Sequence, residues 1–308
     1  MGALGHGDEG ARDVPSRVVS LSRIECIAAG RNRTSAAVDE DGGLFTWGRA
    51  SVVEEKLDGD GQPQDFDGPS GLGYELEPSE NQPTPKRVDS LSPDHVLSVA
   101  LGSGFTLAVT DAGAVFSFGS GTRGLLGHGS LEHEVLPRRI KALAKMELFV
   151  AVAAGRYHAL ALTEGGELYG WGVGRVNGHG RAARTPHRVA ALMGKRVKLL
   201  GAGSLSACAV TEEGELFTWG VPWHGRGYFL GHGINTIQTT PKRVEALVGT
   251  KIAAVAMGVW DTLAADEDGA VWAFGERRAT GLGGPDPRIP VRMPTLIPTL
   301  RVRALKSP

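Results

Sequence analysis

Short stretches in which small or apolar residues alternate with other residues recur along the chain and predict β-strands. VAVAAG at 150–155 and HALALT at 158–163 alternate with a period of two, as buried strands do. ELFTW at 215–219 has the same alternation and follows a Glu-Gly pair. Glycine supplies the positive φ that a tight hairpin turn demands. Stretches of these three kinds are therefore predicted to form three consecutive antiparallel strands.

The strand–turn–strand part of this pattern occurs five times. TEEGELFTWG at 211–220 is closely matched by DEDGGLFTWG, TDAGAVFSFG, TEGGELYGWG and DEDGAVWAFG. A segment that recurs about every fifty residues indicates a repeat architecture. The copies share three glycines. One precedes the second strand (Gly30, Gly102, Gly155, Gly203, Gly258), and one forms the turn (Gly42, Gly113, Gly166, Gly214, Gly269). The last one ends the pattern (Gly48, Gly119, Gly172, Gly220, Gly275).

A proline followed by Arg-Val or a close relative comes after each copy and predicts a fourth strand. Proline has no N–H to donate to a ladder, so this strand is expected at the outer edge. No stretch carries a convincing amphipathic helix, and the nearest, RIKALAKM at 139–146, is short. The prolines are Pro85, Pro137, Pro186, Pro241 and Pro290.

A four-stranded antiparallel unit of this size cannot bury both of its faces alone. Radial stacking of such units around an axis buries them and gives a β-propeller. We therefore predict an all-β fold, a β-propeller of four-stranded blades with about five repeats present, as a single domain over residues 1–308.

The repeat resembles that of the regulator of chromosome condensation family. The run AAGRYHALALTEGGELYGWGVGRVNGHG at 153–180 carries the resemblance, and the five copies extend it over nearly the whole chain. That family forms seven-bladed propellers, whereas five copies are counted here, and GALGHGDEGARDVPSRV at 2–18 matches only the end of a repeat. The resemblance therefore implies a partial or open propeller. Open sheet edges template pairing, so oligomers are expected through them.

Composition narrows the classes of function. The net charge of −1 at pH 7 argues against a generic nucleic-acid binder, so no direct nucleic-acid partner is expected. Cys26 and Cys208 lie far apart, which argues against a disulfide scaffold and favours a reducing compartment, the cytoplasm or the nucleus. Apolar runs such as LFVAVAAG are far shorter than the roughly 18 residues of a membrane span. The N-terminus lacks the pattern of a signal peptide.

Motifs that suggest a cofactor or a metal have structural explanations. GSGTRG at 119–124 formally matches a dinucleotide loop, but the sequence predicts neither the helix nor the βαβ unit that such a loop needs. Neither a cofactor nor a metal is expected, and no G-x-S-x-G, Walker or H-E-x-x-H motif suggests an enzyme. Histidines of Gly-His-Gly loops occupy the same position in different repeats and would not converge on one ion: His6, His128, His179 and His232.

Short loops that differ between the copies follow the glycine before each second strand. In propellers such loops gather on one face around the central channel. Arginines and aromatic residues, which are enriched at binding hot spots, occur in several of them. The alternative is that these side chains only brace neighbouring blades. The predicted partner-binding rim comprises Arg31, Arg33, Arg156, Tyr157, His158, Trp260 and Asp261.

The gap between the first two copies forms an acidic insertion at 49–84. It holds nine acidic residues against Arg49 and Lys56, and it has few large apolar residues. We expect a solvated excursion from the propeller, with an arm that docks a basic partner as the alternative. Its acidic candidates are Glu54, Glu55, Asp58, Asp60, Asp65 and Asp67.

These observations predict a non-catalytic protein-interaction propeller, a scaffold or a regulatory binding module. The resemblance supplies the alternative, because the family's founding member is a guanine-nucleotide exchange factor for the small GTPase Ran. There the propeller inserts a hairpin wedge near the phosphates. The acidic insertion is interrupted by proline and departs from a compact wedge. The expected partner is a protein, with a small GTPase as the alternative.

Overall fold

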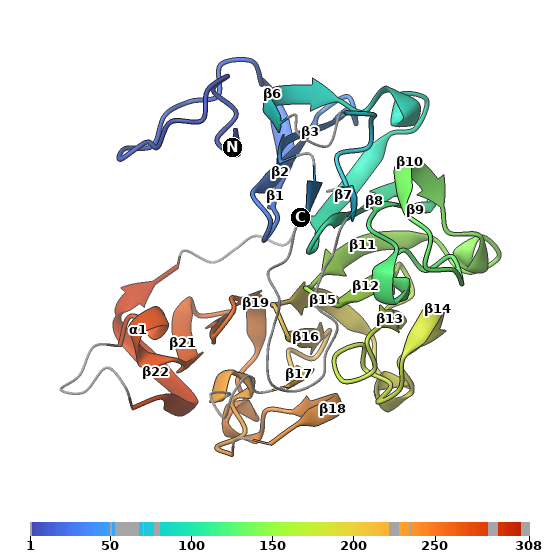
Figure 1. Cartoon of the computed structure of the whole chain (residues 1–308). Coiled ribbons are helices and arrows are strands. Elements are labelled where there is room, and N and C mark those ends of the chain that lie inside the picture. The colour runs from blue at the N-terminus through green and yellow to red at the C-terminus, as the bar shows by residue number, and fades with distance from the viewer. Residues whose placement is uncertain are drawn as a thin grey trace, which may run out of the picture. The chain divides into compact units, whose positions relative to one another are not determined.

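β-Strands dominate the structure, a computed structural model (Figure 1). It describes residues 2–49, 51–52, 68–69, 71–76, 81–221, 228–234, 236–282 and 289–302. Within these ranges the only α-helix is α1, a single turn at Arg277–Thr280. The all-β prediction is confirmed.

Five four-stranded sheets contain nearly all of the described strands. In the first two sheets the spatial order of the strands follows the chain. The first sheet contains β1 (Ile24–Ala29), β2 (Thr34–Asp39), β3 (Leu44–Arg49) and β6 (Asn81–Arg87). The second sheet contains β7 (Val96–Leu101), β8 (Phe105–Thr110), β9 (Val115–Gly119) and β10 (Glu134–Arg139). A small ladder joins β4 (Ser51–Val52) to β5 (Gly68–Pro69).

The other three sheets repeat this order. The third sheet contains β11 (Phe149–Ala154), β12 (His158–Thr163), β13 (Leu168–Gly172) and β14 (Ala183–Arg188). The fourth sheet contains β15 (Val197–Ala202), β16 (Ser206–Thr211), β17 (Leu216–Gly220) and β18 (Gln238–Arg243). The fifth sheet contains β19 (Ile252–Met257), β20 (Asp261–Asp266), β21 (Ala270–Gly275) and β22 (Val291–Arg301). The prediction of four-stranded blades in five copies is confirmed.

Contacts divide the chain into two compact units. One comprises Met1–Ala154 with Arg184–Pro186, and the other Gly155–Ala183 with His187–Pro308. In each unit, apolar side chains from consecutive sheets pack into a common core, as they do in a propeller. The core of the first unit contains Ala36, Val38, Leu44, Val88, Leu91, Val96, Val99, Leu101, Ala108 and Phe118. A core of the second unit contains Cys208, Val210, Leu216, Val244, Leu247, Ile252, Ala264 and Phe274.

The turn between the second and third strand of each of the first four sheets also joins that sheet to the next inner strand. The five turn glycines have φ values from 69° to 84°, as the sequence predicts. Their carbonyls accept hydrogen bonds from the backbone of residues that follow: Val96 N–H to Gly42 O and Ile252 N–H to Gly214 O are both 3.0 Å. A Cβ on Gly214 would lie 2.7 Å from Lys251 Cα. Glycine is therefore required here twice, for the turn and for the close approach of the next strand.

The proline strand is anchored by a short turn that follows it. Four 3₁₀ turns come after it, and each buries one leucine: Asp89–Leu91, Lys141–Leu143, Ala190–Leu192 and Glu245–Leu247. The apolar residue just before each turn donates its N–H to the third strand, as from Ile140 to Val115 O at 2.8 Å. RIKALAKM, the best helix candidate of the sequence, contains one of these turns.

In the fifth sheet the edge proline is Pro294, not Pro290. Gly275 pairs with Val291 and Ala273 with Thr295, as Gly220 pairs with Gln238 and Thr218 with Lys242. This register gives Pro294 the same place in the fifth sheet that Pro241 has in the fourth sheet. Ile297 then takes the buried place of Val244, and the strand continues to Arg301 without a 3₁₀ turn.

A buried aromatic residue near the end of each third strand packs in the core. Trp171, Trp219, Phe118 and Phe274 are fully buried, and Trp47 is 7% exposed. Trp219 Nε1–H donates to Val176 O in the loop of the preceding repeat at 2.9 Å. Trp47 makes the same bond to Ala3 O, also at 2.9 Å. The N-terminal segment therefore supplies the first sheet with the loop that a preceding repeat supplies elsewhere.

We expect Trp219→Phe to lower the free energy of unfolding by about 2 kcal/mol or more. The ring is tolerated, since Phe118 and Phe274 occupy equivalent positions, but the buried Val176 carbonyl loses its donor and a small cavity remains. Denaturant unfolding followed by circular dichroism measures the loss. Trp272→Phe is the control, because this side chain is only half-buried and its Nε1–H donates to the Asp266 carboxylate at 3.2 Å, a partner that water can replace, so it should cost clearly less. Equal losses for the two variants would contradict the role of the bond.

Candidate binding loops and a turn pocket

The loops between the first and second strands are shaped by a glycine that receives the next side chain. A Cβ on Gly102 would lie 2.1 Å from Phe105 Cε1, and one on Gly155 would lie 2.1 Å from His158 Cε1. A Cβ on Gly258 would meet the Asp261 carboxylate at 2.4 Å. The residue that opens each second strand therefore folds back over its own loop, which fixes the loop conformation.

In the first unit, the predicted rim residues Arg31 and Arg33 are both exposed. Arg33 has a φ of 60°, which lies in the left-handed region. Between them, Asn32 donates its Nδ2–H to Ser103 Oγ in the loop of the second sheet at 3.2 Å. This loop thus both presents arginines to solvent and braces its neighbour.

In the second unit, the predicted rim residues Arg156, Tyr157 and His158 are buried. They are 5%, 9% and 0% exposed, respectively. The guanidinium of Arg156 lies over the Tyr157 ring, 4.8 Å from its centroid, and the Arg156 N–H donates to Ser204 O at 3.0 Å. These contacts brace neighbouring loops, which is the alternative role that the sequence left open for the rim residues.

The imidazole ring of His158 is fully buried. Among the described residues, neither of its ring nitrogens has a partner. Burial lowers the pKa of His158 to about 4, and the nearby Ser206 backbone offsets only part of this effect. The ring is therefore neutral at physiological pH.

Trp260 and Asp261 are half-buried at the same loop of the fifth sheet. Trp260 O accepts the Glu276 N–H at 2.8 Å. Burial raises the pKa of Asp261, the Trp260 backbone partly offsets the rise, and the charge of Glu276 adds to it. The predicted rim residues are divided between the two units. That they form one continuous surface therefore stays a prediction.

The acidic candidates of the insertion, Glu54, Glu55, Asp58, Asp60, Asp65 and Asp67, lie outside the described residues. The described part at 71–76 forms the ordinary loop of the repeat. Thr46 Oγ1–H donates to Leu72 O at 2.5 Å, as Thr218 Oγ1–H donates to Leu230 O at 2.6 Å. Tyr74 stands where other repeats have the loop histidine, and it donates to Thr46 O at 2.9 Å. Burial raises its pKa to about 12.

The loop histidines are held against the third strand of their own sheets. His128 Nε2 lies 3.0 Å from Ser117 Oγ, His179 Nε2 lies 3.1 Å from Gly170 O and His232 Nε2 lies 3.1 Å from Thr218 Oγ1. Burial lowers the pKa of all three. Across the described ranges there is no group of three or more His, Cys, Asp or Glu side chains suited to a metal ion. Nor does any described helix have the length and apolar character to cross a membrane.

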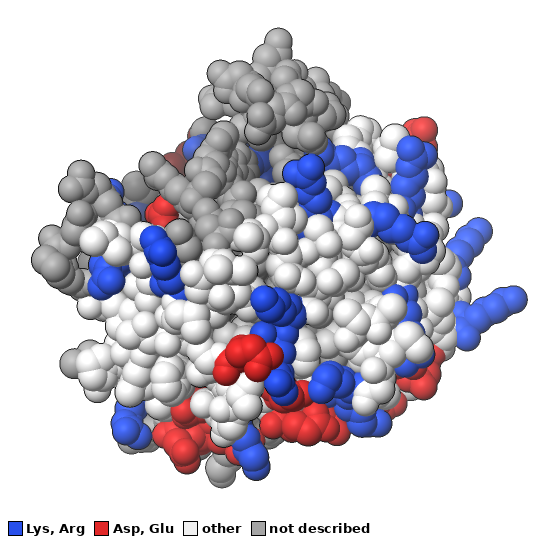
Figure 2. Space-filling view, turned by 90° about the horizontal axis from the view of Figure 1, so that it is seen from below, with Lys and Arg blue, Asp and Glu red and all other residues white. Residues whose placement is uncertain are grey.

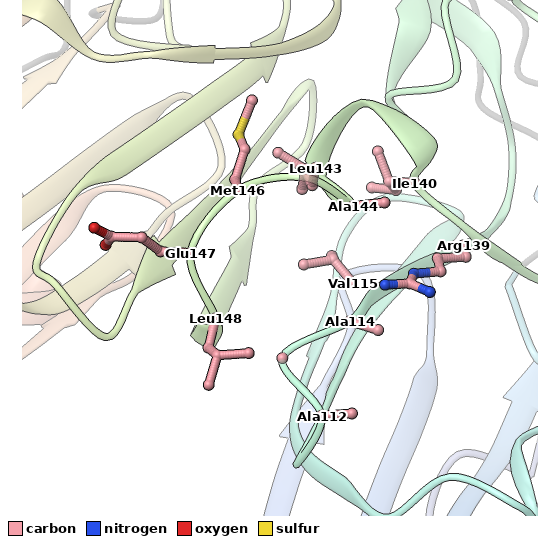
Figure 3. A pocket seen from close by; sticks show the side chains of 11 residues that line it. Ala112, Ala114, Val115, Arg139, Ile140, Leu143, Ala144, Met146, Glu147 and Leu148 are labelled. Atoms are coloured by element: carbon pink, nitrogen blue, oxygen red, sulfur yellow. The ribbon is translucent and has the colours of Figure 1, made fainter.

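A small pocket lies beside the turn of the second sheet (Figure 3). Its volume is about 60 Å³, which suits one aliphatic side chain and is far below the several hundred Å³ of a cofactor site. Ile140 and Leu143 are buried in its wall, whereas Met146 and Leu148 are 42% and 51% exposed. The turn residues Ala112–Val115 and the side chains of Arg139, Ala144 and Glu147 complete the lining.

Elsewhere, equivalent turns carry ion pairs. Glu167 pairs with Arg188 at 2.5 Å, and Glu215 pairs with Arg243 at 2.9 Å. Figure 2 shows one face of the molecule, where acidic side chains gather beside basic ones along the lower edge of the view. The sequence carries the signal that distinguishes the second sheet, because TDAGAV has alanines where TEEGEL has glutamates. From the sequence alone this turn is interpreted as ordinary architecture and is not identified as a candidate site.

Comparisons with known proteins agree with this architecture. A model of the regulator of chromosome condensation (RCC1) repeat matches residues 112–162 and 213–265, and a second model of this repeat matches 149–181. The mouse E3 ubiquitin-protein ligase HERC2 is 36% identical over 270 residues, which are 85% of this chain and 5% of HERC2. The Ultraviolet-B receptor UVR8 of Arabidopsis thaliana is 31% identical over 280 residues, 89% of this chain and 58% of the receptor.

Solved structures share the fold at lower identity. Human WBSCR16 has a TM-score of 0.71 at 23% identity, covering 89% of this chain and 66% of that one. Prp20p from Saccharomyces cerevisiae has a TM-score of 0.66 at 20% identity, covering 86% and 61%. The chain thus spans less than two thirds of the length of each of these proteins.

We expect His158→Phe to make the protein less sensitive to acid. The pKa of His158 is lower in the folded protein than the 6.5 of an ordinary histidine, so protonation favours the unfolded chain as the pH falls below about 6.5. Between pH 7 and pH 5 this histidine should cost about 2 kcal/mol of stability, a cost that phenylalanine removes. Phe105 fills the same place in the second sheet, so the ring fits.

Unfolding free energies of both proteins at pH 7 and pH 5 measure this difference. The comparison isolates His158, because the other buried histidines are present in both. An unchanged pH dependence in His158→Phe would contradict the buried, neutral state of this ring.

Proposed function

Because this chain belongs to the regulator of chromosome condensation repeat family, we propose that it is a non-catalytic protein-interaction module. The observation that carries the proposal is the contrast between a constant scaffold and variable surface positions. All five sheets share one strand order and the same glycine-bearing turns. The loops and turns that they present differ in charge and apolar character. A rigid repeat with variable projections is typical of a binding protein.

The exposed arginines Arg31 and Arg33 are the rim residues that we propose for direct contact with a partner. Arg156, Tyr157 and His158 act instead by bracing their loop from the inside. Trp260 and Asp261 are half-buried and would contribute at the edge of a contact. Both cysteines are free thiols, which supports a reducing compartment, the cytoplasm or the nucleus.

Guanine-nucleotide exchange on a small GTPase is the second candidate function. It is favoured by the likeness to Prp20p, which binds Gsp1p and histones. The likeness rests on 20% identity and supports a shared fold. An exchange factor must bind the nucleotide-free GTPase far more tightly than the loaded form, since a ligand shifts an equilibrium only through differential affinity.

A nucleotide-release assay separates the two functions. The protein is added to Ran and related GTPases loaded with fluorescent GDP, and the decay of fluorescence is followed. We expect an acceleration below about tenfold, because the interaction module gains nothing from emptying the nucleotide site. Catalytic release by substoichiometric protein that disappears when residues 53–67, between β4 and β5, are deleted would establish exchange instead.

We expect Arg31→Glu to weaken partner binding by about 30-fold, which corresponds to roughly 2 kcal/mol for a hot-spot arginine. Proteins that the full chain retains from a cell extract are quantified by mass spectrometry against the variant. Arg17→Glu makes the same charge change at another exposed arginine of the same unit and serves as the control. Equal retention by all three proteins would remove Arg31 from the binding surface.

A further inference from the structure

We propose that the turn pocket of the second sheet docks a short acidic segment of a partner protein. An aliphatic side chain of the segment enters the pocket, and a neighbouring carboxylate binds the guanidinium of Arg139. The inference rests on the proposed interaction function and names one site for it. The pocket lies wholly within the first unit.

Arg139 occupies a position whose equivalents in the third and fourth sheets bind a carboxylate of their own sheet. It pairs in register with Phe116, as Arg188 pairs with Tyr169 and Arg243 with Phe217. The carboxylate partners of the last two arginines come from the residue just before the third strand, Glu167 or Glu215. In the second sheet that residue is Ala114, which has no charge to offer.

In the first sheet a carboxylate lies near the equivalent arginine, although the two form no ion pair among the described residues. A Cβ placed on Gly43 would lie 3.0 Å from Asp39 Oδ1 and 3.3 Å from Arg87 Nε, so the two side chains border the same small space. The second sheet has Thr110 in place of Asp39, and its hydroxyl accepts the Ala114 N–H at 3.3 Å. Both routes to an internal carboxylate are therefore closed for Arg139.

Glu147 lines the same pocket but does not neutralise Arg139. Figure 3 shows the two side chains on opposite sides of the pocket, with the Glu147 carboxylate directed away from the guanidinium. Among the described residues, no acidic side chain forms an ion pair with Arg139, and its side chain is exposed. The site thus offers a cation at a place where the third and fourth sheets have a matched ion pair.

The apolar character of this junction also departs from the other sheets. The residue just before the next inner strand is His95, Arg196 or Lys251 elsewhere, and here it is Leu148. Met146 lies two residues before Leu148, and the residues at the same position of the other junctions are Pro93, Gly194 and Gly249. Solvent-exposed Met and Leu beside a buried Ile140 and Leu143 form an apolar edge next to a single cation.

This combination fits an acidic peptide better than a nucleic acid. A phosphate backbone is bound by several cations, whereas the pocket is lined by one arginine, one carboxylate, the backbone of the turn and several apolar side chains. A small pocket with one orienting charge suits the recognition of one or two side chains of a peptide. The charge-assisted bond to Arg139 would fix the register, and the apolar side chain would add buried area.

The test uses a variant that gives Arg139 a carboxylate from its own sheet. Ala114→Glu supplies the carboxylate that Glu167 and Glu215 supply in their sheets, so it should fold as the parent protein does while occupying Arg139. Random heptapeptides displayed on phage are selected on the full chain and counter-selected on Ala114→Glu. We expect the enriched peptides to share an Asp or Glu next to Leu, Ile, Val or Met.

An enriched heptapeptide, labelled with fluorescein, then gives dissociation constants by fluorescence polarisation. We expect binding at least tenfold weaker with Ala114→Glu and with Arg139→Gln, and also when the acidic residue of the peptide is replaced by its amide. Arg188→Gln is the matched control, since this arginine already has its internal partner, and it should change binding less than twofold. Thermal unfolding of each variant confirms that it is folded.

Peptides that bind the parent chain and Ala114→Glu equally would overturn the pocket as the site while leaving the interaction function intact. Enriched peptides without a carboxylate would also overturn it. If no peptide is enriched on the parent chain, the docking site is rejected, and the proposed function is then decided by the extract and nucleotide-release measurements alone.

Discussion

One turn glycine per repeat is the constraint on which this architecture depends. It must adopt a positive φ to close the hairpin, and its carbonyl must receive the N–H of the next inner strand. A side chain at Gly42, Gly113 or Gly214 would strike the backbone of the residue before that strand, at 2.7 Å in each case. The hairpin turn and the junction between repeats are therefore the same piece of structure. The buried aromatic at the end of the third strand adds the second link, to the loop of the preceding repeat.

Much of this could be predicted because periodic glycines, prolines and alternating apolar residues report local backbone requirements. The positive φ at Gly166 and the edge position of Pro186 follow from the chemistry of one residue each. The position of Pro290 was misread, since only the pairing of Gly275 with Val291 reveals that Pro294 occupies the edge site. Burial of Arg156 and His158 is likewise not visible in the sequence, because this loop is packed against another repeat, where Ser204 O accepts the Arg156 N–H and Gly203 O lies beside Gly155. The carboxylates of the acidic insertion lie outside the described residues and stay a prediction.

The same reasoning separates architecture from function within the repeat. The turn glycine is constant, whereas the residues that flank it and the side chain that it meets at the junction vary in charge. In the third and fourth sheets these flanking residues neutralise an arginine of the outer strand. In the second sheet alanines take their place, and Leu148 and Met146 border the junction. Alanine in place of glutamate thus replaces a turn with an internal ion pair by a turn whose arginine receives no carboxylate from that position.

A double-mutant cycle between positions 114 and 139 tests this account most directly. The unfolding free energies of the parent chain, Ala114→Glu, Arg139→Ala and the double variant are measured at low salt. If the second turn is equivalent to the others, the introduced carboxylate should couple favourably to Arg139 by about 0.5 to 1 kcal/mol, as exposed ion pairs do. High salt should reduce this coupling. A coupling of zero or of the opposite sign would mean that Arg139 does not lie where its equivalents do, and the claim of a turn lacking its anion would fail.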